Sequence, residues 1–266
     1  MTSEQRQIAA AKRLGVNRPI DEVLALARAL LEFDASAASK RSKAGCGIGI
    51  AILLVIGGLV AAGNNHVELG LALAAVGVLG TIVTIVLYVR LRAEDLSDNL
   101  REAAVPFLAV LREDMNPGDP LHVNIDLSPT VSAPKLKKKS DPYKKGAYYK
   151  IVDSLYVDPW FDGSATLADG TKLRWKVIEH LIQQKKTKRT GNKIKSKTKI
   201  KRKTVATVTL AFATKEYAVE GDAQREEKRA TVTLAKKQKS TEANSPAFQM
   251  LVDLIAEGYG RVKASA

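Results

Sequence analysis

The chain has 266 residues, and its 42 Lys and Arg against 28 Asp and Glu give a formal net charge of +14. The whole excess lies after residue 116, because residues 117–266 hold 30 basic and 16 acidic residues while the first 116 hold 12 of each. This asymmetry points to a polyanionic partner and not to a fold. A single cysteine and three dispersed histidines exclude an intrachain disulfide framework and show no metal-ligand spacing, so neither a metal nor a cofactor is expected.

The first 43 residues are predicted to form a cytoplasmic helical segment. Apolar side chains recur on one helical face within residues 19–34. Pro19 and the acidic pair Asp21 and Glu22 are typical of a helix start. This stretch therefore predicts an amphipathic helix ahead of the first long apolar run.

Two uncharged apolar stretches follow, at residues 44–62 and 69–89. About 20 apolar residues in a helix cross a hydrocarbon core of ~30 Å, so the two stretches predict a transmembrane hairpin with a short connection. A buried helical hairpin in a soluble protein is the alternative. Because neither stretch contains Asp, Glu, Lys, Arg or His, a pump or coupled transporter is not expected and the hairpin is interpreted as an anchor.

Basic residues flank this hairpin on both sides, and the connection between the spans has none. The positive-inside rule therefore predicts that both termini are cytoplasmic in a multi-pass protein of the inner (plasma) membrane. The flanking residues are Lys40, Arg41 and Lys43 before the first span and Arg90 and Arg92 after the second.

Small residues recur at four-residue spacing in both spans, which lets helix backbones approach closely. The spacing serves either the hairpin itself or contacts between copies, so a homo-oligomer is one expectation. The candidate helix-packing residues are Gly45, Gly49, Gly57, Gly58, Gly77 and Gly80.

Residues 90–116 predict a juxtamembrane helix, in which Pro106 should cause a kink or begin a new helix. This helix and the one at 19–34 either pack together as a stalk or lie flat on the bilayer. Their acidic or neutral charge favours the stalk, because interfacial helices are usually rich in Lys and Arg. The apolar positions of the second helix are Leu96, Leu100, Ala104, Phe107 and Leu111.

Residues 117–266 predict a basic, β-rich cytoplasmic domain, because the hydropathy alternates with a period of two. A final helix is predicted at 245–260, with Ser245 as N-cap and Pro246 at its first position. The fold class is thus a membrane α+β protein: a two-helix transmembrane hairpin with juxtamembrane helices, then a cytoplasmic barrel or curved sheet with a C-terminal helix. The strand-like segments are 121–126, 148–157, 164–167, 171–175, 204–213 and 230–234.

Residues 171–214 predict one long β-hairpin with a basic tip, which turns at Thr190-Gly191-Asn192. Lysine stands at every second position from 193 to 203, so these lysines should share one strand face. A second basic segment spans 135–145. The candidate polyanion-binding residues are Lys185, Lys186, Lys188, Arg189, Lys193, Lys195, Lys197, Lys199, Lys201, Arg202 and Lys203, with Lys137, Lys138 and Lys139.

Four interpretations of this basic hairpin stay open. It is a solvated arm that prevents edge-to-edge association, a surface for anionic lipid headgroups, a nucleic-acid binder or a site for an acidic protein. Against nucleic acid, the tip has no aromatic side chain for base stacking. In favour of lipid, the domain is expected beside the cytoplasmic leaflet.

No set of residues predicts a catalytic site. Four neighbouring carboxylates are interpreted as strand ends and turns, namely Asp153, Asp158, Asp162 and Asp169. Trp160, Phe161 and Trp175 are expected in the core. The function expected is therefore a non-enzymatic membrane-anchored scaffold or adaptor; the alternatives are a membrane-tethered nucleic-acid-binding protein and a structural subunit of a larger oligomeric membrane assembly.

Overall fold

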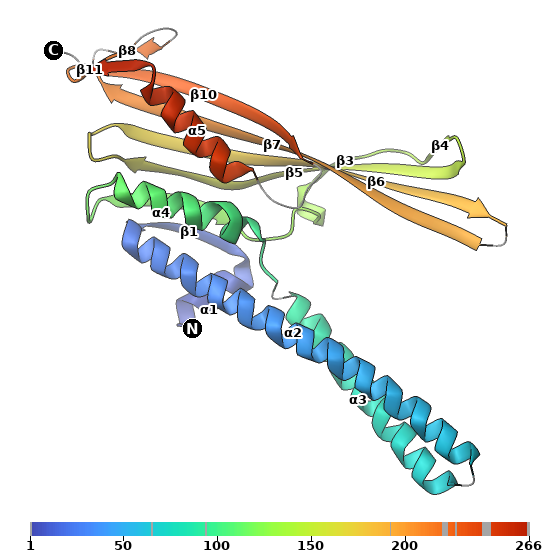
Figure 1. Cartoon of the computed structure of the whole chain (residues 1–266). Helices are drawn as coiled ribbons and strands as arrows, with labels where there is room; N and C mark the ends of the chain where they lie inside the picture. The colour runs from blue at the N-terminus through green and yellow to red at the C-terminus, as the bar shows by residue number, and fades with distance from the viewer. Residues whose placement is uncertain are drawn as a thin grey trace. The chain divides into compact units, whose positions relative to one another are not determined.

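The computed structural model describes residues 2–64, 66–93, 95–191, 193–219, 223–226, 228–240 and 246–264 (Figure 1). Its elements are α1 (Ser3–Ala11), β1 (Arg13–Pro19), α2 (Ile20–Gly63), α3 (Val67–Ala93), the π-helix η1 (Leu100–Ala104), α4 (Val105–Glu113), β2 (Pro120–Asp126), the 3₁₀ helix η2 (Ala133–Lys135), β3 (Leu136–Lys139), β4 (Tyr143–Lys145), β5 (Tyr148–Thr166), β6 (Lys172–Thr190), β7 (Lys193–Ala213), β8 (Tyr217–Val219), β9 (Gln224–Arg225), β10 (Arg229–Ser240), α5 (Ala247–Tyr259) and β11 (Val262–Ala264). The predicted cap Ser245 and the turn residue Asn192 lie outside the described residues.

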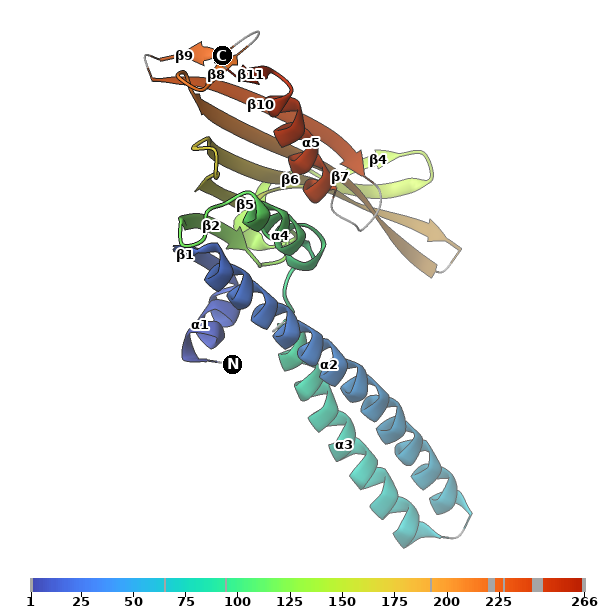
Figure 2. The same cartoon turned by 60° about the vertical axis from the view of Figure 1, so that its left-hand side comes forward.

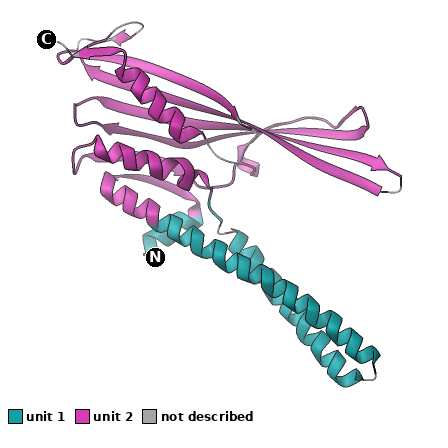
Figure 3. Cartoon of the chain, viewed as in Figure 1, with its two compact units in different colours: residues 1–10, 29–96 teal, residues 11–28, 97–266 magenta. Residues whose placement is uncertain are grey.

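The chain divides into two compact units (Figure 3). The hairpin unit comprises residues 1–10 and 29–96, and the sheet unit comprises residues 11–28 and 97–266. This division differs from the boundaries expected at 43, 89 and 116. The difference arises because the segments before and after the hairpin contribute buried side chains to the sheet unit.

The hairpin unit contains two helices that are long and apolar enough to cross a membrane. Only 11% of the most apolar window of each helix is buried, which agrees with membrane association and not with the core of a soluble protein. The predicted helix at 19–34 and the first predicted span form one continuous helix of 44 residues, α2. The polar stretch between them, residues 35–43, stays helical because its Ala, Lys and Arg residues have high helix propensity.

The backbones of α2 and α3 approach closely where small residues face each other. A Cβ added to Gly58 would lie 2.6 Å from both Ala74 N and Gly70 O. One added to Gly77 would lie 2.7 Å from Val55 N. The absence of a side chain at these glycines therefore sets the spacing of the two helices.

The six predicted helix-packing glycines separate into two groups. Gly58, Gly77 and Gly80 face the other helix of the hairpin, and a Cβ on Gly80 would make an ordinary 3.5 Å contact with Ala51 Cβ. A Cβ on any of the other three would meet nothing within 4 Å among the described residues, and these are Gly45, Gly49 and Gly57.

The sheet unit contains a nine-stranded antiparallel sheet in the order β1-β2-β5-β6-β7-β10-β9, with β3 and β4 also paired to β5. The strand order begins at β1 and ends at β9 without closing on itself. The sheet is therefore open, and of the two predicted alternatives the barrel is wrong. A separate two-stranded pair joins β8 and β11. Strand β1 was not predicted; it pairs with β2 along its whole length, and its Leu14 is fully buried.

Helices α4 and α5 lie on the same face of this sheet (Figures 1 and 2). An aromatic cluster fills the core below α4. The ring centroid of Phe107 lies 5.8 Å from that of Phe161 and 5.2 Å from that of Trp175. Trp160, Phe161 and Trp175 are all buried, as predicted. We call this side the helix-covered face and the opposite side the open face.

The predicted juxtamembrane helices supply part of this core. The first turns of α2 bury Ile20, Val23 and Leu24, and Asp21 forms an ion pair of 2.6 Å with Arg112 of α4. Residues 20–28 and α4 thus belong to the sheet unit, where the predicted packing between the helices before and after the hairpin is present. Pro106 stands in the first turn of α4 and begins a new helix, as one of the two expected outcomes.

Strand β5 replaces two predicted strands and the turns between them. Asp158-Pro159 and Asp162-Gly163 lie inside this 19-residue strand, so the prediction of turns there is wrong. A register shift between Pro159 and Phe161 accommodates the proline, which has no N–H for the ladder. Gly163 is required because a Cβ there would overlap the Trp175 ring.

The other predicted turn and the C-terminal helix are present. Gly170 has φ +77°, and Asp169 accepts a hydrogen bond of 2.9 Å from the Thr171 backbone N–H. Helix α5 begins at Ala247, and Pro246 is its N-cap and not its first helical residue. The helix packs on β7 and β10, and Lys236 of β10 forms a 2.6 Å ion pair with Asp253.

Candidate anion-binding surface

The predicted long hairpin is confirmed as β6 and β7. Its strands are 19 and 21 residues long, and their register runs from Lys172 opposite Ala211 to Thr190 opposite Lys193. Gly191, with φ +58°, stands in the two-residue connection that this register leaves. The far end of this hairpin extends beyond β10 and α5 (Figure 1). We call its residues 185–203 the basic hairpin.

Eight lysines of the basic hairpin share its open face. Lys186 stands directly opposite Lys197, and Lys188 stands directly opposite Lys195. Directly paired residues point to the same side of a sheet, which confirms the predicted common face and adds two lysines from β6. The eight are Lys186, Lys188, Lys193, Lys195, Lys197, Lys199, Lys201 and Lys203.

The helix-covered side of the basic hairpin is less basic. Lys185, Arg189 and Arg202 lie on this side, in alternation with the lysines of the open face. Exposed apolar side chains lie among them, with Ile194 67% and Ile200 40% exposed. The two faces of the basic hairpin therefore differ in charge.

No salt bridge involves a lysine of the basic hairpin within the part of the chain that the structure describes. Lys186 Nζ lies 5.5 Å from the Tyr148 ring centroid, a cation–π contact. Like charges placed directly opposite on neighbouring strands destabilise a sheet. A bound polyanion would remove this repulsion.

Strand β5 separates the second predicted basic segment from the basic hairpin, because β5 pairs with β3 on one side and with β6 on the other. Lys138 stands opposite Leu155 and Lys139 opposite Ser154, and all four residues of β3, including Lys137, are exposed. Lys139, Lys150 and Lys185 line a hollow of about 500 Å³ on the helix-covered side. The structure thus brings basic residues of both predicted segments together.

Two buried carboxylates stand where the basic hairpin meets the core of the sheet unit: Asp158, which the sequence predicted in a turn, and Glu179, which sequence reasoning missed. Asp158 and Glu179 are directly opposite each other, and their side chains are 1% and 4% exposed. Burial raises the pKa of both carboxyl groups. Lys135 Nζ lies 2.9 Å from Asp158 Oδ1, and Arg202 Nε lies 3.6 Å from Glu179 Oε1.

Two basic residues, the predicted anion-binding Arg202 and Lys135 of the segment 135–145, therefore differ from the exposed lysines. Arg202 is half-buried beside Glu179, whereas Lys199 and Lys201 on the same strand are exposed. Lys135, from the basic segment 135–145, is buried and internal. A signal was present in the sequence, since Glu179 and Arg202 occupy positions in the alternation where β6 and β7 otherwise carry inward-facing apolar residues.

The remaining carboxylates of the predicted group each have structural partners. Asp153 accepts a hydrogen bond of 3.0 Å from Tyr143, and Asp162 one of 3.2 Å from Asn124. Asp169 Oδ2 accepts three hydrogen bonds, all of 2.9 Å, from Thr171, Tyr217 and Tyr259. Burial opposes ionisation of Asp169, but these hydrogen bonds hold its pKa below the usual value.

Over the described ranges, no group of three or more His, Cys, Asp or Glu side chains is arranged to hold a metal ion. Comparison with family models, with curated protein sequences and with solved structures gave no match. The functional argument therefore depends on the geometry of the basic hairpin.

Proposed function

We propose that this protein is a non-enzymatic membrane-anchored adaptor whose basic hairpin binds anionic lipid headgroups. The observation that carries the proposal is the single face of eight lysines, in which lysine stands directly opposite lysine. Preventing edge-to-edge association requires only a few exposed charges. It does not require lysine at every second position over eleven residues of β7.

The membrane anchor supplies the reason for choosing lipid over other polyanions. The proposal takes α2 and α3 to be the two transmembrane spans, so residues before and after the hairpin lie on the same side of the membrane. The flanking Lys and Arg favour the cytoplasm for that side. A lysine near an anionic cytoplasmic leaflet contributes about 1 kcal/mol, and the attraction decays over a Debye length of ~8 Å.

The test measures how close the basic hairpin lies to the lipid surface in the full-length chain. A single fluorophore is attached at Ile194→Cys in a C46S background and paired with acceptor lipids in reconstituted bilayers. We expect strong energy transfer in bilayers with anionic lipid and weak transfer in neutral ones. Salt should remove the transfer, because the lysines are exposed and screened.

The K195Q/K197Q/K199Q variant should lose about 3 kcal/mol of attraction, roughly a hundredfold in occupancy of the surface. The matched control is K172Q/K176Q/K215Q, which removes three exposed charges outside the basic hairpin. Equal energy transfer in neutral and anionic bilayers would contradict the proposal. Release from anionic bilayers by added duplex DNA, with a steep dependence on salt, would favour the nucleic-acid alternative instead.

A further inference from the structure

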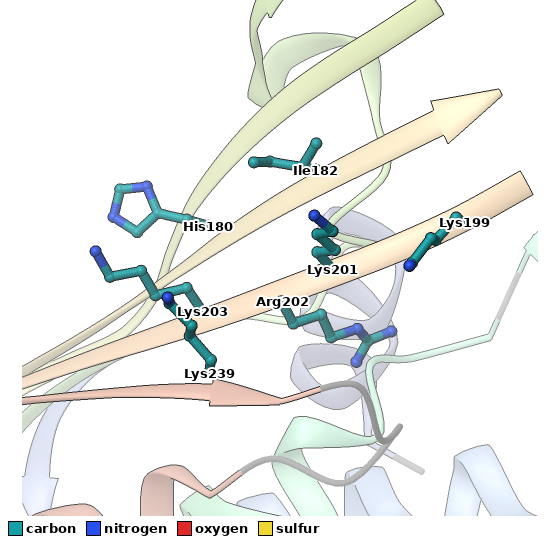
Figure 4. Close-up of a pocket in the computed structure, with 7 residues that line it drawn as sticks. All are labelled: His180, Ile182, Lys199, Lys201, Arg202, Lys203 and Lys239. Atoms are coloured by element: carbon teal, nitrogen blue, oxygen red, sulfur yellow. The ribbon is translucent and has the colours of Figure 1, made fainter. Parts of the chain in front are cut away.

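A pocket lies on the sheet where β10 ends and the basic hairpin continues. It has a volume of about 470 Å³ and is lined by residues of β6, β7 and β10 (Figure 4). We call it the lysine pocket, and its lining residues are His180, Ile182, Lys199, Lys201, Arg202, Lys203 and Lys239. None of the described residues that line it is Asp or Glu.

The strand register explains why the cations gather there. His180, Lys203 and Lys239 occupy one row across the three strands, because His180 pairs with Lys203 and Lys203 pairs with Lys239. Ile182 and Lys201 form the next row. Directly opposite side chains have Cβ atoms about 4.5–5.5 Å apart, so Lys203 and Lys239 stand side by side on the open face, and Lys201 and Lys199 follow at successive two-residue steps along β7.

The third strand distinguishes this pocket from the rest of the basic hairpin. Within the described residues, the pairing of β10 with β7 runs as far as Ser240 opposite Arg202. Towards the tip the lysines of the open face lie on β6 and β7, whereas the lysines of the pocket lie on β7 and on β10, which supplies Lys239. Ile182, which is 42% exposed, supplies an apolar side chain between the cations.

This combination suits a ligand with a concentrated negative charge attached to an apolar group. A phosphomonoester carries nearly two negative charges at neutral pH and has three terminal acceptor oxygens. A phosphodiester carries one charge and has two such oxygens. Ammonium groups bind ionised oxygen through charge-assisted hydrogen bonds, so the lysine pocket favours the monoester.

We propose that the lysine pocket recognises the phosphomonoester headgroup of a membrane lipid. Lys199, Lys201, Lys203 and Lys239 bind the phosphate oxygens, a ring N–H of His180 donates one further hydrogen bond to them, and Ile182 contacts the apolar part of the lipid. The inference rests on the proposed lipid binding and adds selectivity among headgroups to it. The remaining lysines of the basic hairpin then supply attraction to any anionic surface.

The experiment measures the reactivity of individual lysines in the full-length chain. The protein is reconstituted in bilayers containing phosphatidic acid, a phosphomonoester, or phosphatidylglycerol, a phosphodiester, at equal measured surface potential. Brief acetylation followed by peptide mass spectrometry then gives a rate for each lysine. We expect Lys199, Lys201, Lys203 and Lys239 to react more slowly with phosphatidic acid, and Lys193 and Lys195 to be slowed equally by both lipids.

Two matched double variants assign the selectivity. K203Q/K239Q should remove the difference between the two lipids at Lys199 and Lys201. K193Q/K195Q removes the same charge at the tip and should leave that difference intact. An I182Q variant keeps every cation and should weaken the preference for phosphatidic acid, and an unchanged preference would overturn the apolar contact.

The possible results separate the inference from the proposed function. Equal protection of all hairpin lysines by both lipids would overturn the selectivity and leave the proposed function standing. Protection by neither lipid would overturn both. Protection of the lysine pocket by glycerol 3-phosphate added to neutral bilayers, as strong as that by phosphatidic acid, would overturn the lipid as the source of the phosphomonoester.

Discussion

At the scale of single residues, Glu179 shows how a charge is held at the edge of the core. Its side chain lies between the buried Val177 and Leu181 in the alternation of β6. Asn99 donates a hydrogen bond to it, and Arg202 offsets part of its charge. Burial nevertheless dominates and raises the pKa of its carboxyl group.

The raised pKa gives a prediction with a definite sign. Glu179 contributes full stability below its ordinary pKa of 4.5, and this contribution is lost as the pH rises through the raised pKa of the folded protein. The E179Q variant cannot ionise there, so its free energy of unfolding should increase relative to wild type across this window. Each unit by which the pKa is raised corresponds to about 1.36 kcal/mol.

Urea unfolding of the full-length chain in a mild detergent measures this difference at a series of pH values. Trp160 and Trp175 are the two tryptophans of the chain, and both lie in the core of the sheet unit, so their fluorescence reports on that unit alone. E257Q, at an exposed position of α5, is the control. If the free energy of unfolding changed with pH in parallel for E179Q and wild type, ionisation of Glu179 would not be the cause of the pH dependence.

At the scale of elements, the α2–α3 hairpin depends on which glycines face inward. A Cβ on Gly47 would lie 3.9 Å from Thr84 Cβ, close to the mean separation of about 3.8 Å in disulfides. A Cβ on Gly49, two residues further along α2, would meet nothing within 4 Å. The two positions therefore form a matched pair for a crosslinking test.

We expect the C46S/G47C/T84C variant to form an intrachain disulfide on mild oxidation, while C46S/G49C/T84C does not. Adding G58V to the first variant should slow the crosslink, because the new side chain would meet the backbone of Ala74 and Gly70. The fraction crosslinked is measured by blocking the free thiols and then determining the mass of the intact chain by mass spectrometry. Equal crosslinking of the Gly47 and Gly49 variants would contradict the packing of α2 on α3.

At the scale of the whole molecule, the proposed function depends on the orientation of the chain in a membrane. Cys46 lies beside the basic residues that precede the first span, and Asn64 lies in the connection between α2 and α3. If both termini are cytoplasmic, a membrane-impermeant maleimide should label C46S/N64C in intact cells. Wild-type Cys46 should be labelled only after permeabilisation, and the opposite pattern would place the sheet unit outside the cytoplasm.

The features that follow from local patterns were predicted well. The two apolar helices follow from length and absence of charge, since span length is a local property. The lysine face of β7 follows from strict alternation, because successive side chains of a strand point to opposite sides. The β6–β7 pairing was predicted because its turn and both of its strands are adjacent in the chain.

Features that depend on distant pairing appeared only in the folded chain. Strand β1 exists because β2, about a hundred residues later, offers it a partner. The pairing of β10 with β7 sets Lys239 opposite Lys203, although the local sequence of Lys239 resembles an exposed surface. The pairing of β5 with β6 sets Asp158 opposite Glu179, although the local sequence of Asp158 resembles a turn. Periodicity predicts each strand separately, whereas burial of the common core determines which strands become neighbours. That strand pairing brings together both the buried carboxylates and the residues of the lysine pocket.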